Sequence, residues 1–489
     1  MSATHMSSAD AAWLHMDRPT NLMVINSVLL FDEPVDWERV RRITQERLVD
    51  RYPRFRQRVV ESRLPLSTPR WEDDPDFALE HHIHHLALPA PGDQRALQEL
   101  VGELMTVPLD RNRPLWQEYL VDNLGGGAAM IVRMHHCIAD GIALARVMLS
   151  MTDSAPVAGI APRRPRHALR RSRLILGGLP VPGTQPVARV VGAAAGLARQ
   201  GLQVAVSPSH AARLAGAVAR DGATALRLLL TPADAASAIK GEPRVSRRVA
   251  WSRPLPLAQI KRIAHRHDAT VNDVLLAAVS GGLRHYLVDR GHPALEIRAM
   301  VPFNLRPLDR PVPRELGNRF GLVLLPLPVG VSGAYRRLNE VHKRMAEIKA
   351  GRDGPVSYGI LSLMGKAPEP VERRIVDLFS AKGTAVMTNV PGPRETVYLA
   401  GTPVRTVLVW APTSGHIGMS VSIFSYRGEV TVGLMVDAAL VPEPERIVRE
   451  LERELRALAA LAPHAGRSRR RVARAPRARA SASRVSPKG

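Results

Sequence analysis

The sequence predicts an α/β protein with two folded regions, a connector and a tail. Apolar runs of strand length alternate with amphipathic helical segments over residues 1–150 and again over residues 241–465. Residues 151–240 begin with an Arg-, Pro- and Gly-rich stretch and continue into Ala-rich segments, which is typical of a variable connector that carries surface helices. Residues 466–489 have almost no apolar content, so we expect a disordered basic tail there.

The first region is expected to mix strands with short helices. Residues 22–31 form an apolar run rich in strand-forming residues, and residues 77–88 alternate like a half-buried strand. Asp36 can cap a helix that begins at Trp37, because its carboxylate can accept hydrogen bonds from the free amides of the first turn. Two further strands, separated by a glycine-rich turn, are predicted at 114–122 and 128–135.

The second region has longer predicted elements. A long apolar helix is expected over residues 271–287, and a helix over residues 445–461 would place Ile447, Leu451 and Leu455 on one face. A shorter helix is predicted over residues 257–267. Apolar and alternating runs predict strands at 246–252, 297–301, 322–327, 384–388, 404–409, 417–426 and 430–436.

The net charge of +23 is concentrated in two stretches. Residues 155–220 hold ten arginines, and residues 467–489 hold eight arginines and one lysine; neither stretch contains an acidic residue. Together they carry 19 of the 23 net charges, so the rest of the chain is nearly neutral. The tail has no aromatic side chains to stack on bases, so no specific nucleic acid is expected as a partner. The arginines could instead bind anionic headgroups of a membrane or lipid droplet.

The cysteine content and the hydropathy of the chain indicate the cellular compartment of the protein. The single cysteine, Cys137, excludes an internal disulfide framework and fits a reducing compartment. The first residues lack a basic region followed by an apolar core, so no signal peptide is expected, and no run of about 20 apolar residues occurs. The expected location is cytoplasmic, with peripheral association with the inner membrane face or lipid inclusions.

One seven-residue run carries most of the information about chemistry: His135-His136-Cys137-Ile138-Ala139-Asp140-Gly141, or H-H-x-x-x-D-G. It joins a predicted strand to a predicted helix. Successive strand residues face opposite sides, so one histidine can face a substrate while the other orients the loop. We assign His136 as the general base, because a rigid, neutral imidazole can take a proton from a hydroxyl. The motif therefore predicts an acyltransferase.

The end of the motif is expected to support the histidines. Asp140 can hold the turn through backbone hydrogen bonds or an arginine partner, and Arg306 is a candidate for that partner. Gly141 is expected to allow a backbone conformation that a side chain would block.

The motif resembles that of the bacterial wax ester synthase/acyl-CoA:diacylglycerol acyltransferase family, and it also occurs in other CoA-dependent acyltransferases and in peptide-synthetase condensation domains. Further segments resemble the family in order along the chain, over about residues 8 to 462 with a variable middle. They are Ala9-Asp10-Ala11-Ala12-Trp13-Leu14-His15, Pro114-Leu115-Trp116, Asn272-Asp273 and Thr388-Asn389-Val390-Pro391-Gly392-Pro393.

The resemblance implies that the two regions are similar halves of a chloramphenicol-acetyltransferase-like fold, with the site in a channel between them. It implies that an acceptor hydroxyl, deprotonated by His136, attacks an acyl-CoA thioester and expels CoA without a covalent acyl-enzyme. The implied substrates are a long-chain acyl-CoA and either diacylglycerol or a long-chain alcohol. No cofactor and no metal are expected.

Several roles stay open from the residues alone. Asn272 and Asp273 can cap a helix or shape the channel. Trp116 fits core packing better than substrate contact, and Asn389 belongs to a rigid turn that can also border the channel. Two other functions remain as alternatives: a condensation-type enzyme that accepts a carrier-protein thioester, and a nucleic-acid-binding or scaffolding protein that uses its basic tail.

Two features could be mistaken for other chemistry. His81-His82-Ile83-His84-His85 suggests a metal site. On a strand, however, His82 and His84 would share one face and His81, Ile83 and His85 the other, and no nearby cysteine completes a site. Cys137 directly follows His136, so a thiol nucleophile could be suspected there. On an extended strand it would face away from the side that His136 faces, and we therefore interpret Cys137 as a small buried residue. The motifs of serine hydrolases, zinc metalloproteases and phosphate-binding loops are missing from the sequence.

Overall fold

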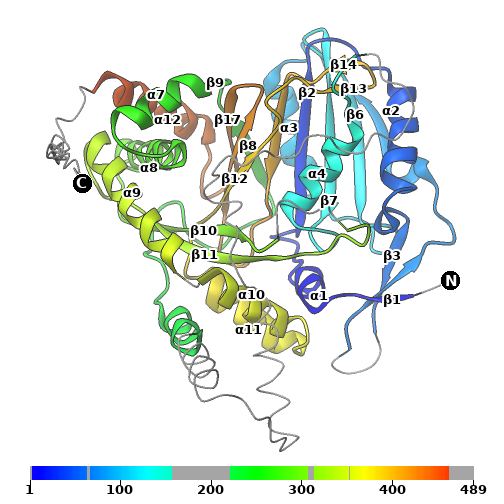
Figure 1. The fold of residues 1–489 in the computed structure, drawn as a ribbon, viewed down its shortest axis with the longest axis horizontal. Coiled ribbons are helices and arrows are strands. Elements are labelled where there is room, and N and C mark those ends of the chain that lie inside the picture. Colours follow the sequence, from blue (N-terminus) through cyan, green and yellow to red (C-terminus); the bar gives the residue numbers. More distant parts are fainter. Residues whose placement is uncertain (1–2, 63–66, 157–220, 307–312, 352, 462–489) are drawn as a thin grey trace, which may run out of the picture.

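A computed structural model describes residues 3–62, 67–156, 221–306, 313–351 and 353–461, and it confirms the α/β class. Figure 1 shows the amino-terminal half, in blue to cyan, beside the carboxyl-terminal half, in green to red. The predicted tail and most of the connector lie outside the described residues. Of the Ala-rich segments of the connector, residues 221–230 are described, and they are helical.

The amino-terminal lobe is built on a five-stranded sheet with the order β15-β2-β7-β6-β5. Neighbouring strands are antiparallel except for β5 and β6, which are parallel. All residues of the two strands β2 and β7 are buried, which is typical of strands covered on both faces. The strands are β2 (Val24–Phe31), β5 (Ile83–Ala87), β6 (Trp116–Leu124), β7 (Gly127–His135) and β15 (Thr406–Trp410).

Helices cover both faces of this sheet. Helix α3 (Gln94–Leu104) packs in one core cluster with Val28 of β2 and Ile131 of β7. Helix α4 (Gly141–Met151) lies over the opposite face, near Met134. Helix α2 (Trp37–Thr44) is capped as predicted, since the Arg39 amide donates to the Asp36 carboxylate at 2.9 Å.

The carboxyl-terminal lobe has a larger mixed sheet with the order β11-β10-β12-β16-β17-β8, and β9 pairs with β17. Its strands are β8 (Arg247–Trp251), β9 (Leu255–Pro256), β10 (Ile297–Asn304), β11 (Phe320–Leu327), β12 (Ala385–Pro391), β16 (Met419–Tyr426) and β17 (Glu429–Asp437). Its helices are α7 (Leu257–Arg266), α8 (Val271–Asp289), α9 (Ala334–Ala350), α10 (Asp353–Met364), α11 (Glu369–Ser380) and α12 (Pro444–Ala460).

The core of this lobe forms where α8 and α12 pack on the sheet. The predicted apolar face of α12 is buried there: Ile447, Leu451 and Leu455 share a cluster with Leu276 and Leu283 of α8. Other elements lie outside this core, and residues of α1, β4 and β13 belong to a separate apolar cluster. These elements are α1 (Ser8–His15), β1 (Thr4–His5), β3 (Gln57–Val60), β4 (Arg70–Asp73), β13 (Tyr398–Leu399) and β14 (Thr402–Pro403).

Strand β15 connects the two lobes in a way that the sequence did not indicate. It belongs to the carboxyl-terminal half but pairs antiparallel with β2, with Leu408 opposite Val28. A boundary drawn along the sequence therefore does not separate the two sheets. Trp410, at the end of β15, is fully buried, and Gly433 of β17 permits its close approach, because a Cβ there would lie 2.9 Å from the indole nitrogen.

The predicted strand over residues 77–88 is shorter than expected. Residues Leu79–His81 form a 3-10 turn, so strand β5 begins at Ile83. His82 therefore precedes the strand, and it does not share a strand face with His84, contrary to the expectation from alternation.

Candidate active site

The paired histidines lie at the end of strand β7, where hydrogen bonds to backbone hold them from two sides. The amide of His135 donates to the carbonyl of Leu115 at 2.9 Å, and the amide of His136 donates to the carbonyl of Met23 at 2.7 Å. Both side chains are buried, with His136 only 5% exposed. The predicted P-L-W segment therefore supports the strand end that presents the histidines.

The ring of His136 is fixed by aromatic contacts. It stacks on the indole of Trp13 in α1, with ring centroids 4.3 Å apart and an angle of 18°, and Phe320 lies 5.4 Å away. Burial lowers the pKa of His136 to about 4, because water cannot solvate the charged imidazolium. Its buried Nδ1 makes no hydrogen bond to the described part of the chain. The imidazole is therefore neutral near pH 7 and held in place.

His135 has a different environment. Its Nδ1 accepts a hydrogen bond from the amide of Cys137 at 3.2 Å, so the ring proton lies on Nε2, which is 3.7 Å from a carboxylate oxygen of Asp17. The geometry fits a residue that orients the loop. Cys137 is buried as predicted, and burial raises the pKa of its thiol well above the ordinary value.

Asp140 joins three segments. One carboxylate oxygen caps α4 by accepting from the amide of Ala143 at 2.8 Å. The other accepts from Arg306 at 3.1 Å and from the amide of Arg319 at 3.1 Å. The arginine partner suggested by the sequence is therefore present, and this ion pair links the motif to the carboxyl-terminal lobe.

The expectation for Gly141 was wrong. Gly141 is the first residue of α4, its φ is not positive, and a Cβ at this position would meet no atom within 4 Å. A side chain is therefore not blocked by the backbone conformation or by neighbours. Gly141 instead borders a cavity.

A polar network that the sequence analysis missed holds the His136 loop. The side-chain amide of Asn318 donates to the carbonyl of His136 at 2.7 Å and to the carboxylate of Asp10 at 2.8 Å, and the Asn318 backbone amide donates to the same carboxylate at 2.8 Å. The amide of Gly317 donates to Ile138 at 2.9 Å. Burial raises the pKa of Asp10.

Only weak signals could have pointed to these partners. Asp10 and Trp13 lie in the opening segment that resembles the family, but nothing there indicates a contact with His136 more than 120 positions away. Asn318 lies two residues before strand β11, and Phe320 is the first residue of that strand; neither lies in a distinctive local pattern. Packing of the two lobes brings them to the motif.

The other residues predicted for the site lie away from the histidine motif, one in the core and the others between α8 and β12. Trp116 is fully buried, stacks on His82 at 4.6 Å and donates its indole N–H to Phe55, which agrees with core packing. Helix α8 is capped by Thr270, which forms a capping box with Asp273, so Asn272 is not the cap. The side chain of Asn272 instead accepts a hydrogen bond from Asn389 at 2.8 Å, joining α8 to β12.

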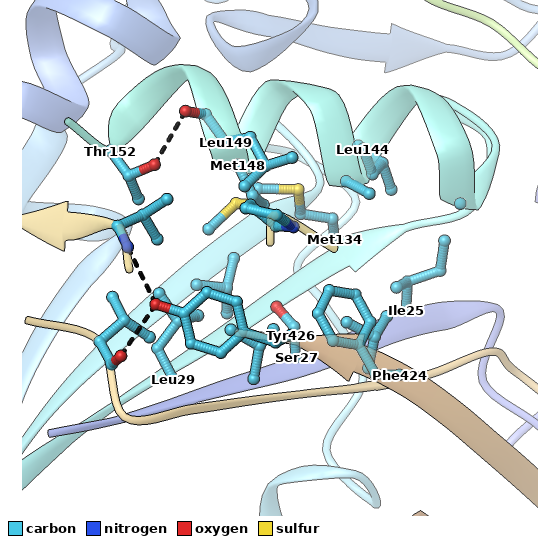
Figure 2. A pocket seen from close by; sticks show the side chains of 18 residues that line it. Ile25, Ser27, Leu29, Met134, Leu144, Met148, Leu149, Thr152, Phe424 and Tyr426 are labelled. Atoms are coloured by element: carbon cyan, nitrogen blue, oxygen red, sulfur yellow. Dashed lines mark hydrogen bonds between the residues drawn. The ribbon is translucent and has the colours of Figure 1, made fainter. Parts of the chain in front are cut away.

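An apolar cavity lies beside the motif (Figure 2). It has an empty volume of about 690 Å³, part of which is open to solvent, and lies between strands β2 and β7, helix α4, and segments of the carboxyl-terminal half. Met134, two residues before His136, and Gly141 both border it. His136 itself is not among the lining residues.

The described residues contain no cluster of three or more His, Cys, Asp or Glu side chains that could hold a metal ion. Residues 81–85 show why the local histidine pattern does not make one. His82 stacks on Trp116, His84 packs near Tyr119, and His85 pairs with Asp122 at 2.8 Å.

The fold is shared with acyl-transferring and condensing enzymes. The solved wax ester synthase/diacylglycerol acyltransferase from Marinobacter aquaeolei VT8 matches with a TM-score of 0.64 and 22% identity, covering 94% of this chain and all of that one. A starter condensation domain of rhizomide synthetase matches with a TM-score of 0.57 and 15% identity, covering 94% of this chain and 95% of that one. The two lobes are therefore of the chloramphenicol-acetyltransferase-like and condensation-domain class.

Sequence comparison places the chain within that class. Residues 6–275 match the model of the wax ester synthase/diacylglycerol acyltransferase catalytic domain, and residues 316–459 match the carboxyl-terminal domain of the same family. The "Probable diacyglycerol O-acyltransferase tgs1" of Mycobacterium tuberculosis H37Rv is 30% identical, covering 96% of this chain and 98% of its own length. The chain belongs to the wax ester synthase/diacylglycerol acyltransferase family and is an acyltransferase.

Proposed function

We propose that this acyltransferase moves a long-chain fatty acyl group from acyl-CoA to the hydroxyl of diacylglycerol or of a long-chain alcohol, with His136 as general base. The observation that carries the proposal is the state of His136: a buried imidazole with a low pKa and an unpaired nitrogen, in the motif of this family. Such a group is uncharged at neutral pH and can accept a proton from an alcohol.

The proposed reaction needs no covalent enzyme intermediate. His136 takes the proton of the acceptor hydroxyl while the oxygen attacks the thioester carbonyl. The tetrahedral oxyanion then collapses, the carbon–sulfur bond breaks, and the departing CoA thiolate takes the proton from the imidazolium. General base assistance of this kind contributes about 10²–10⁴-fold. Positioning of the two bound substrates contributes much of the remaining acceleration.

The other residues of the motif act on the position of His136. His135 and Asp140 hold the loop through hydrogen bonds to the backbone, and Arg306 anchors Asp140 to the second lobe. The paired side chains of Asn272 and Asn389 would stabilise the channel from the carboxyl-terminal lobe. In this proposal these five residues position the base or shape the channel, and none of them reacts.

A labelled palmitoyl-CoA assay with diacylglycerol and with hexadecanol tests the proposal. The wild-type protein should form triacylglycerol or wax ester without a carrier protein, and His136→Ala should lose about 10²–10⁴-fold in rate. His265→Ala, which removes an exposed histidine of α7, is the control and should retain full activity. Equal product from wild type and His136→Ala would rule out the base assignment, and a requirement for a carrier-protein thioester would favour the condensation-type alternative.

We also propose that the protein works at an anionic membrane or lipid-droplet surface on the cytoplasmic side. Its products would be almost insoluble in water, and the arginines of residues 155–220 and 467–489 could each contribute about 1 kcal/mol of attraction to anionic lipid. Within the described ranges, each helix is too short or too polar to cross a bilayer.

Vesicle binding tests the contribution of the tail. Removal of residues 467–489 should weaken binding to vesicles that contain phosphatidylglycerol and leave the weak binding to neutral vesicles unchanged. Added salt should reduce the difference, because it screens the charges. Unchanged binding to anionic vesicles would eliminate the tail from this account.

A further inference from the structure

The cavity beside the motif has the chemistry of a hydrocarbon site. Of its 18 lining residues, three carry a polar side chain, and none carries a charge. The hydroxyl of Thr152 already donates to Leu149 at 3.0 Å, and the hydroxyl of Tyr426 donates to Val404 at 2.9 Å and accepts from Val397 at 3.0 Å. A polar ligand would lose its hydration here and find few partners, whereas an apolar one would gain by leaving water.

The shape of the cavity follows helix α4. Its lining begins at Gly141, where the motif ends, and reaches Thr152, just past the end of the helix. Figure 2 shows Leu144 and Met148 projecting from α4 toward Phe424 and Tyr426 of β16. At about 1.5 Å of rise per residue, this helical wall is roughly 16 Å long. The cavity is therefore elongated and leads away from the histidine loop.

Both lobes contribute to the walls. The floor comes from alternate residues of β2 and β7, which face α4 because a strand turns every second side chain to the same side. Val407 and Val409 of β15, which pair with Leu29 and Ser27 of β2, extend this floor, and Phe424 of β16 adds a wall from the carboxyl-terminal half. An elongated apolar space at the junction of two lobes is a common form of ligand site.

From these observations we infer that the space under α4 holds the straight hydrocarbon chain of a substrate and that Ala145 and Met148 set the chain length it accepts. The inference rests on the proposed function, since it places the chain of one of the two substrates next to the reacting group. The same chemistry could come from the acyl group of acyl-CoA or from the alkyl group of the acceptor, and the experiment below separates these two sources.

Three substitutions on one helix make the test. Ala145→Leu adds volume to the cavity wall and should shorten the preferred chain. Met148→Ala removes volume and should lengthen it. Ser150→Leu makes a comparable addition to α4 at a residue that does not line the cavity, and it should leave the preference unchanged. Because the first two changes act in opposite directions, a loss of folding in one variant still leaves the other informative.

Chain-length preference is measured in two arms. The first compares dodecanoyl-CoA with palmitoyl-CoA at a fixed acceptor, and the second compares dodecanol with hexadecanol at fixed palmitoyl-CoA. In Ala145→Leu, the ratio of kcat/KM for the long chain over the short chain should fall roughly tenfold in one arm, because each methylene that no longer fits costs about fourfold. That arm identifies the substrate held by the cavity. Unchanged ratios in both arms for both cavity variants would overturn the inference.

Binding distinguishes failure of this inference from failure of the proposed function. Palmitoyl-CoA or hexadecanol should raise the Tm of the wild-type protein more than that of Ala145→Leu, and CoA alone should affect both equally. If the wild type forms no product but this difference in binding appears, the cavity site holds and the proposed reaction does not. If product forms and neither preference nor binding depends on residues 145 and 148, the reaction holds and the cavity site does not.

Discussion

At the level of single residues, the state of His136 comes from its surroundings. The ring is enclosed by Trp13 and Phe320, and burial lowers its pKa to about 4, while an unperturbed histidine titrates near about 6.5. The low pKa keeps His136 in its neutral, proton-accepting form at neutral pH, and it also makes the imidazole a weaker base than an unperturbed histidine. The unfolded chain binds the proton at a higher pH than the folded chain, so this group makes stability fall as pH drops from about 6.5 toward 4.

The pH dependence of activity should report this pKa. We expect kcat/KM to stay level from about pH 8 to about pH 5 and to fall only as the pH approaches 4, within the range where circular dichroism shows a folded protein. Trp13→Ala should move the acid limb upward, because it admits water to the ring. An acid limb near pH 6.5 in the wild type would contradict the assigned environment.

Asn318 is expected to act as a positioning residue for His136. Asn318→Ala removes the donors that link the His136 carbonyl to the buried Asp10 carboxylate, and it should lower kcat about tenfold with little change in the KM for palmitoyl-CoA. The unfolding free energy should fall by about 1–3 kcal/mol, since Asp10 loses a partner. Asn339→Ala, at an exposed position of α9, is the matched control. A rise in KM without a fall in kcat would instead assign Asn318 to substrate binding.

At the level of elements, the start of α4 is held from both lobes. Asp140 caps the helix and receives the Arg306 side chain, which is only 10% exposed, from the segment that follows β10. A single carboxylate thus connects the end of β7, the first turn of α4 and the carboxyl-terminal lobe. A change at this ion pair should affect both stability and the position of His136.

Arg306→Ala should lower the unfolding free energy by about 3–5 kcal/mol, because it leaves a buried carboxylate without its charged partner. Arg306→Lys should cost less but still lower activity, since an ammonium group does not reproduce the two-nitrogen contact. Urea unfolding measures both values. Arg95→Ala removes a pair that is largely exposed and should change stability by less than about 0.5 kcal/mol. An equal loss of unfolding free energy in Arg306→Ala and Arg95→Ala would contradict the buried character of the Asp140–Arg306 pair.

At the level of the whole molecule, β15 makes the two lobes interdependent. It is hydrogen-bonded to β2 of the first sheet, and Trp410 packs near Trp251 of the second lobe at 6.1 Å. The walls of the apolar cavity also come from both lobes. Neither lobe can complete its core or the site without the other.

Unfolding of the described body should therefore be one cooperative event. Thermal transitions followed by circular dichroism and by tryptophan fluorescence should coincide. Trp410→Ala should destabilise the protein by about 3–5 kcal/mol while keeping a single transition, because the lost contacts belong to both lobes. Two separated transitions, one per lobe, would contradict this coupling.

The sequence located most elements because their patterns are local. Helix α8, helix α12 and strands β7 and β16 appear within a few residues of their expected bounds, since each has a strong apolar period. Helices α9, α10 and α11 were not predicted. In α10 the reason is visible: Gly354 and Pro355 are poor helix formers, and the helix is stabilised by close packing on Gly321 of β11.

The features of the candidate site also separate into those with a local sequence pattern and those without one. The histidine motif and its strand-to-helix setting can be read from seven consecutive residues, because the alternation of a strand and the capping of a helix act over a few positions. The enclosure of His136, the Asn318–Asp10 support, the position of β15 and the apolar cavity depend on contacts between residues more than a hundred positions apart. Such contacts have no local sequence signal, since they arise only when the lobes pack together.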